Sequence, residues 1–82
     1  MEHKFKVGDR VCVTKIDNQT YYSDAPYKIG DIGTITFCGQ ALSYGTNDYL
    51  IVFDRLKADG KDPKWCALEH WLELENPLIV CE

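Results

Sequence analysis

The sequence predicts an all-β fold, a small five-stranded barrel with one short helical turn near residues 68–70. Two observations support this prediction. The stretch "FKVGDRVCVT" at residues 5–14 recurs in similar form as "YKIGDIGTITF" at residues 27–37, so a Gly-Asp turn twice precedes an alternating apolar run. Such alternation indicates strands with one buried face. A chain of 82 residues also has room for only one core, and a barrel pairs its strands without exposed edges.

The first strand is expected at about residues 10–16, after the Gly8-Asp9 turn. The alternating residues expected on the buried side of this segment are Phe5, Val7, Val11 and Val13. A long polar and aromatic loop follows. The second strand is expected at about residues 32–38, with Ile35 and Phe37 pointing inward and Thr34 and Thr36 pointing outward.

Gly30 and Gly33 flank the second Gly-Asp turn. A turn or bulge at this point requires a positive φ or the close approach of a neighbouring backbone. We expect Gly33 to occupy a barrel turn with a positive φ.

The stretch "YLIVFDR" at residues 49–55 is β-branched and aromatic throughout and is the strongest strand candidate. Tyr49, Ile51 and Phe53 should point inward, which leaves Leu50 and Val52 outside. An apolar strip on the outer face needs a covering. Of the two coverings available, the C-terminal tail is favoured over a second chain that uses this tail as an added strand. Asp59-Gly60 then marks a hairpin connection.

The stretch "KWCALEHWLELE" at residues 64–75 has helical propensity, but two short strands separated by one helical turn suit the barrel better. Trp65 and Trp71 are expected in the core. Asn76-Pro77 ends the pattern. The sequence therefore predicts one barrel domain at residues 1–76 and a tail at residues 77–82 that packs on the barrel or on a partner.

The order of "GDRVCV", "GDIGTI", "YLIVFD" and "WCALEHWLEL" resembles the SH3-like barrels of the KOW type, over roughly residues 5–75. "DIGTI", "LIVFDRL" and "ALEHWLEL" are also similar to the small ferredoxin-docking protein of photosystem I and its relatives among electron-transport accessory proteins. The same motifs are also similar to those of small uncharacterised bacterial and phage-encoded proteins. The resemblance implies an SH3-like fold and a binding role: KOW domains bind RNA or nucleoproteins, and the photosystem I protein helps to dock ferredoxin.

Aromatic loop residues favour a non-enzymatic protein-binding accessory or regulatory module. In SH3-like barrels the two long loops line a common cleft, where aromatic rings stack on proline, arginine or nucleobases. The candidate partner-binding residues are Tyr21, Tyr22, Tyr27 and Tyr44. The alternative for each tyrosine is a lid folded back onto the core.

The second functional hypothesis is a KOW-like RNA or nucleoprotein-binding domain. Its candidate residues are Lys4, Lys6, Arg10, Arg55, Lys57 and Lys64, from two basic segments at residues 1–15 and 55–64. A net charge of −4 disfavours nucleic acid, because neutralising phosphates supplies most of the affinity of such domains.

Cofactor, metal and catalytic residues are expected to be absent. The sequence has four cysteines, none of them in a C-x-x-C pair: Cys12, Cys38, Cys66 and Cys81. They are interpreted as reduced thiols, with a disulfide or a metal site as the alternatives. Neither His3 nor His70 has a nucleophile at a typical catalytic spacing. The sequence has no apolar run long enough for a membrane span, and its first residues do not resemble a signal peptide. We expect a cytoplasmic protein, monomeric or homodimeric.

Overall fold

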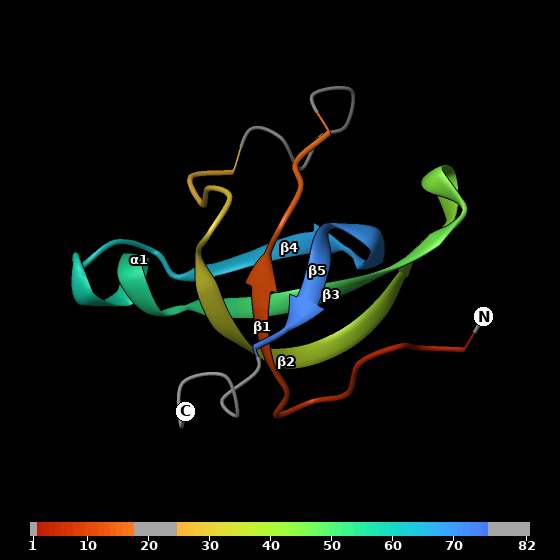
Figure 1. The fold of residues 1–82 in the computed structure, drawn as a ribbon, viewed down its shortest axis with the longest axis horizontal. Coiled ribbons are helices and arrows are strands. Elements are labelled where there is room, and N and C mark those ends of the chain that lie inside the picture. The colour runs from red at the N-terminus through yellow and green to blue at the C-terminus, as the bar shows by residue number, and fades with distance from the viewer. Residues whose placement is uncertain (1, 18–24, 76–82) are drawn as a thin grey trace, which may run out of the picture.

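The computed structural model describes residues 2–17 and 25–75. Five strands form one antiparallel sheet in the order β4-β3-β2-β1-β5 (Figure 1). The elements are β1 (Arg10–Val13), β2 (Ile32–Ala41), the 3-10 turn η2 (Leu42–Tyr44), β3 (Thr46–Phe53), α1 (Asp54–Ala58), β4 (Lys64–Leu68), the 3-10 turn η3 (Glu69–Trp71) and β5 (Leu72–Leu74). The all-β prediction is therefore confirmed.

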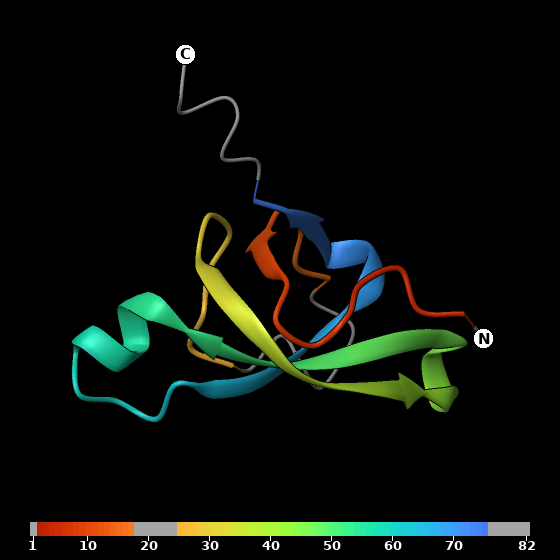
Figure 2. The same ribbon diagram turned by 90° about the horizontal axis from the view of Figure 1, so that it is seen from below.

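The sheet is strongly curled. Figures 1 and 2 show β1 and β5 crossing one side of the layer formed by β2, β3 and β4. Strand β2 belongs to both parts, because its first residues pair with β1 while most of its length pairs with β3. The core fills the space inside the curl, and its largest fully buried side chains include Trp71, Tyr49, Phe53, Ile35 and Ile51.

Strand β3 has the predicted facing. Asn47, Tyr49, Ile51 and Phe53 are buried, while the residues between them are only partly buried. The strand begins at Thr46, earlier than expected, since residues 46–48 pair with the end of β2. The expected inward and outward sides of this strand are therefore confirmed.

Strand β2 contradicts one prediction. Ile35 pairs with Ile51 and is buried, but Phe37 pairs with Leu50 and is 62% exposed. The register shifts between Ile35 and Phe37, so that one extra residue, Thr36, lies in β2. Such a bulge reverses the alternation beyond it. The prediction that Phe37 points inward is wrong for this reason.

The first Gly-Asp repeat also departs from simple alternation. Phe5, Val11 and Val13 are buried as expected, but Val7 is 60% exposed. The turn accounts for the difference, since Gly8 has a φ of 96° and Asp9 N donates to Lys6 O at 3.0 Å. Val7 lies inside this turn and not in a strand. The first strand itself is shorter than residues 10–16.

Gly33 does not have the predicted positive φ. A Cβ atom at this position would lie 2.5 Å from Ile51 Cγ2 and 2.6 Å from the backbone oxygen of Val52. Gly33 is therefore required by the close approach of β3. Gly30, in contrast, has a φ of 98° and open space around it.

The connection after β3 differs from the expected hairpin because it contains the short helix α1. Leu56 on this helix is buried, and Lys61 N donates to Leu56 O at 3.0 Å. Gly60 has a φ of 74°, which allows the chain to turn back after the helix.

The predicted helical turn near residues 68–70 is present as η3 at Glu69–Trp71, but it is not the single one, because η2 and α1 also lie in the described residues. It lies between β4 and β5, and it places Trp71 in the core with no exposed surface. Trp65 packs against the core and is partly buried, and its Nε1 donates to Asp62 O at 2.7 Å. The predicted tail at residues 77–82 lies outside the described residues. Within residues 2–17 and 25–75, no helix has the length and apolar character needed to cross a membrane.

Candidate protein-binding surface

Four apolar side chains lie together on the side of β2, β3 and β4 that faces away from the core. Phe37 pairs with Leu50, and Leu50 pairs with Cys66, so these three side chains form one row across three strands. Val52 points to the same side, one alternation along β3. We call these four residues the outer sheet face, and the three paired ones its central row.

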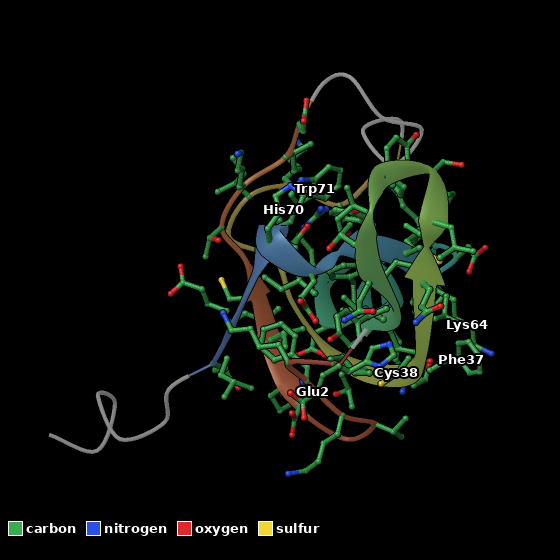
Figure 3. The ribbon with its side chains drawn as sticks, turned by 90° about the vertical axis from the view of Figure 1, so that its right-hand side faces the viewer. Glu2, Phe37, Cys38, Lys64, His70 and Trp71 are labelled. Atoms are coloured by element: carbon green, nitrogen blue, oxygen red, sulfur yellow. The ribbon has the colours of Figure 1, made fainter. Side chains whose placement is uncertain are left out.

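The outer sheet face is accessible. Phe37 is 62% exposed, and the other three members are partly exposed. Figure 3 shows Phe37 projecting outward, on the same side of the molecule as Lys64. An aromatic ring exposed to this extent beside further apolar side chains is a typical feature of a contact surface.

Charged residues border the outer sheet face at its two ends. Lys64 pairs with Val52 at one end, and Asp48 pairs with Leu68 at the other. Lys64 is exposed and Asp48 is partly buried. The face therefore has an apolar centre, a positive charge at one end and a negative charge at the other.

The free edge of the sheet at β4 is partly blocked. Tyr27 Oη donates to Cys66 O at 2.7 Å, and Lys64 N donates to Asp62 Oδ1 at 3.1 Å. Both bonds use backbone groups of the edge strand that a further strand would need. A partner of this part of the sheet therefore has the face available rather than the edge.

Of the four predicted tyrosines, the structure describes Tyr27 and Tyr44, and these two do not share one exposed surface. Tyr27 is 2% exposed, and its ring stacks on Phe53 with centroids 4.5 Å apart. Tyr27 is thus a core residue with almost no surface to offer a partner. Tyr44 lies in η2 at the tip of the β2–β3 hairpin, next to the 75% exposed Leu42. Tyr21 and Tyr22 lie outside the described residues.

The two predicted nucleic-acid-binding arginines are engaged with carboxylates. Arg10 donates to Asp54 through Nη1 at 3.0 Å and through Nη2 at 2.5 Å, and it also forms an ion pair with Glu75. Arg55 donates to Asp31 through Nε at 2.8 Å and through Nη2 at 2.7 Å. Each arginine lowers the pKa of its partner, Asp54 or Asp31, chiefly by these hydrogen bonds. These hydrogen bonds occupy guanidinium N–H groups that a contact with phosphate would also use.

The four predicted lysines are spread over the molecule. Lys4 and Lys6 lie in the N-terminal segment, where Lys4 Nζ is 5.4 Å from the Phe5 ring centroid and Lys6 Nζ is 3.9 Å from Asp9 Oδ1. Lys57 lies on α1, at the opposite end of the long axis from residue 2 (Figure 1). Lys64 borders the outer sheet face. These lysines do not form one basic patch.

A polar cluster holds the N-terminal segment against the sheet. Glu69 Oε2 accepts hydrogen bonds from Tyr49 Oη at 2.5 Å, Lys4 N at 2.9 Å and Asn47 Nδ2 at 3.1 Å. Burial raises the pKa of Glu69, but these hydrogen bonds outweigh it, and the pKa lies below its ordinary value. Burial, together with the bond to Glu69, raises the pKa of Tyr49 to about 12. The cluster was not foreseen, because its members lie far apart in the sequence.

The thiols of Cys12 and Cys66 lie in surroundings that favour the protonated form. Burial is the main cause that raises the pKa of Cys12 and of Cys66, with nearby carboxylates adding to it. A reactive thiol needs the opposite shift. Cys12, Cys38 and Cys66 are free, and Cys81 lies outside the described residues. In the described ranges, no group of three or more His, Cys, Asp or Glu side chains is arranged to hold a metal ion.

Comparison with protein-family models, with curated proteins and with solved structures finds no match to this chain. The function must therefore be inferred from the residues and their geometry.

Proposed function

We propose that this protein is a non-enzymatic protein-binding module with an accessory or regulatory role, and that it contacts its partner through the outer sheet face. The observation that supports the proposal most directly is the exposure of Phe37 at the β2 end of an apolar row that crosses three strands. The bulge at Thr36 turns the Phe37 ring to the outer side of the sheet, so that the ring is not part of the core.

The energetics favour a covered face. Burying the exposed part of Phe37 contributes about 1 to 2 kcal/mol, since a fully buried Phe side chain contributes about 1.5 to 3 kcal/mol. Leu50, Val52 and Cys66 add further apolar area on one side of it. Aromatic residues are a frequent source of binding energy in protein interfaces.

An enzymatic role is disfavoured by the chemistry of the nucleophiles. The raised pKa values of Cys12 and Cys66 keep these thiols protonated near neutral pH. Glu69 and Tyr49 use their polar atoms to hold the N-terminal segment. A nucleic-acid-binding role is disfavoured because Arg10 and Arg55 are already paired with carboxylates.

The proposal includes an SH3-like barrel of the KOW or electron-transport-accessory type. The curl of the five-stranded antiparallel sheet and the helical turn between its last two strands support it. The proposal also includes a cytoplasmic location. The free thiols of Cys12, Cys38 and Cys66 support a reducing compartment.

The test is capture of partners from a lysate of the source organism by the purified, immobilised protein, followed by mild cross-linking and identification of the retained protein. Phe37→Ser should abolish specific retention. Val7→Ser is the matched control, because Val7 is 60% exposed but lies outside the outer sheet face. Circular dichroism checks that both variants fold.

Retention that is equal for both variants would contradict the proposal. Binding of the protein to heparin or RNA at low salt, lost as salt rises, would support the nucleic-acid hypothesis instead.

A further inference from the structure

The charges that border the outer sheet face are self-complementary. Lys64 lies beside Val52, two residues along β3 from Leu50, and Asp48 lies two residues away in the other direction. Consider two copies whose outer sheet faces oppose each other, related by a two-fold axis that runs parallel to the central row in the plane between the two sheets. Rotation by 180° about this axis reverses the strand direction. It therefore places the Lys64 end of one copy over the Asp48 end of the other and places the two central rows over each other.

We infer that the partner of the outer sheet face is a second copy of this chain, packed face to face about that axis. The inference rests on the proposed function, since it needs this face to be a protein contact. In this arrangement each member of the central row meets its own counterpart. The Lys64 side chain of each copy reaches the Asp48 end of the other, so two ion pairs border an apolar centre.

The sheet geometry permits this contact. Facing sheets pack about 10 Å apart with their strands nearly aligned. That spacing brings the rings and aliphatic chains of the two central rows into contact. Strand addition would be a different route to a dimer, but the hydrogen bonds that occupy Cys66 O and Lys64 N partly block that route at the β4 edge.

The size of the face sets the expected affinity. Three strands about 4.8 Å apart, with a length of about 17 Å for the five-residue β4, give a face of about 240 Å². Two such faces bury about 500 Å² before the relief of the side chains is added, which is the range of weak and transient complexes. We therefore expect a weak, reversible dimer with a dissociation constant on the order of 100 µM.

The first measurement is sedimentation equilibrium of the whole chain at concentrations from about 1 µM to 1 mM, a range that lies on both sides of a dissociation constant on the order of 100 µM. The apparent mass should rise from the monomer value of 9.4 kDa towards twice that value. Phe37→Ser should weaken association at least tenfold. Leu42→Ser, which changes the exposed tip of the hairpin instead, should leave it unchanged.

The second measurement tests the proposed symmetry by charge reversal. Lys64→Glu should weaken the dimer, because the new carboxylate at position 64 of one copy then faces Asp48 of the other copy. Asp48→Lys should weaken it as well, because the new ammonium group at position 48 then faces Lys64 of the other copy. An equimolar mixture of the two variants should recover association. In the mixed dimer every border contact again joins opposite charges. A fold check by circular dichroism accompanies each variant.

The remaining outcomes separate this inference from the proposed function. A chain that stays monomeric at every concentration overturns the second copy as the partner. The proposed function still stands in that case if Phe37→Ser abolishes capture of a different protein, and it fails with the inference if nothing is captured. A monomer that dimerises once residues 76–82 are removed identifies the tail as the covering and also overturns the inference. A dimer that Phe37→Ser and both charge reversals leave intact uses another surface, which refutes the packing inferred here.

Discussion

Gly33 gives the most direct test of the packing between β2 and β3. In Gly33→Ala the new Cβ atom would lie 2.5 Å from Ile51 Cγ2, 2.6 Å from Val52 O and 3.1 Å from Phe53 Cα. Two of these three neighbours are backbone atoms of the paired strand, so a side-chain rotation cannot relieve the contact. The strands must separate locally, next to fully buried Ile51 and Phe53.

The expected cost lies at the upper end of the range for overpacking, about 3 kcal/mol. For a domain of this size, 1 kcal/mol lowers Tm by about 4 to 8 °C, so Tm should fall by about 12 to 24 °C. Thermal unfolding followed by circular dichroism measures it. Gly45→Ala is the control, because Gly45 has a φ of 67° with open space around it. Its strain costs about 1 kcal/mol. A Gly33→Ala protein no less stable than Gly45→Ala would refute the close-approach argument.

Three further predictions concern ionisable groups. The lowered pKa of Asp31 stabilises the fold above its ordinary value of 3.8, and this stabilisation is lost as the pH falls through the lower folded value. Asp31→Asn should therefore lower Tm at pH 7 and flatten the acid limb of the curve of Tm against pH; an unchanged acid limb would disprove the role of Asp31. Glu69→Ala should speed hydrogen exchange of the Lys4 amide, which donates to Glu69, and leave β3 amides protected. Because the pKa of Cys66 is raised, alkylation of Cys66 at pH 7 should be slower in the folded than in the urea-unfolded protein, as measured by peptide mass spectrometry.

The strand facing of this protein could be predicted only where the chain follows regular alternation. Tyr49, Ile51 and Phe53 occupy every second position of a continuous strand without a bulge at these residues, and they are buried as predicted. Phe37 follows the same alternation in the sequence, two residues after the buried Ile35, but its side chain is exposed. The facing of Phe37 depends on the bulge, where β2 has one residue more than the paired segment of β3. A bulge is a property of the pairing of two strands and cannot be read from one strand alone.

In the candidate site, too, some features follow from the sequence and others depend on the pairing of strands. The outward facing of Leu50 and Val52 follows from the sequence, because alternation assigns them the side opposite to Tyr49. Phe37 and Cys66 join them only through pairing across three strands. The burial of Tyr27 and the ion pair of Arg55 with Asp31 likewise depend on contacts between distant segments. The propensity of a single residue carries no information about such contacts.

The sequence by itself determined that the chain is all-β, that a helical turn separates its last two strands, and that Trp71 belongs to the core. These properties follow from local alternation, turn chemistry and apolar volume, which act over a few residues. Only the tertiary structure decided which apolar residues remain outside and which charges are already paired. Both depend on register and on the approach of segments as far apart as Lys4 and Glu69, and these are set by the packing of the whole sheet.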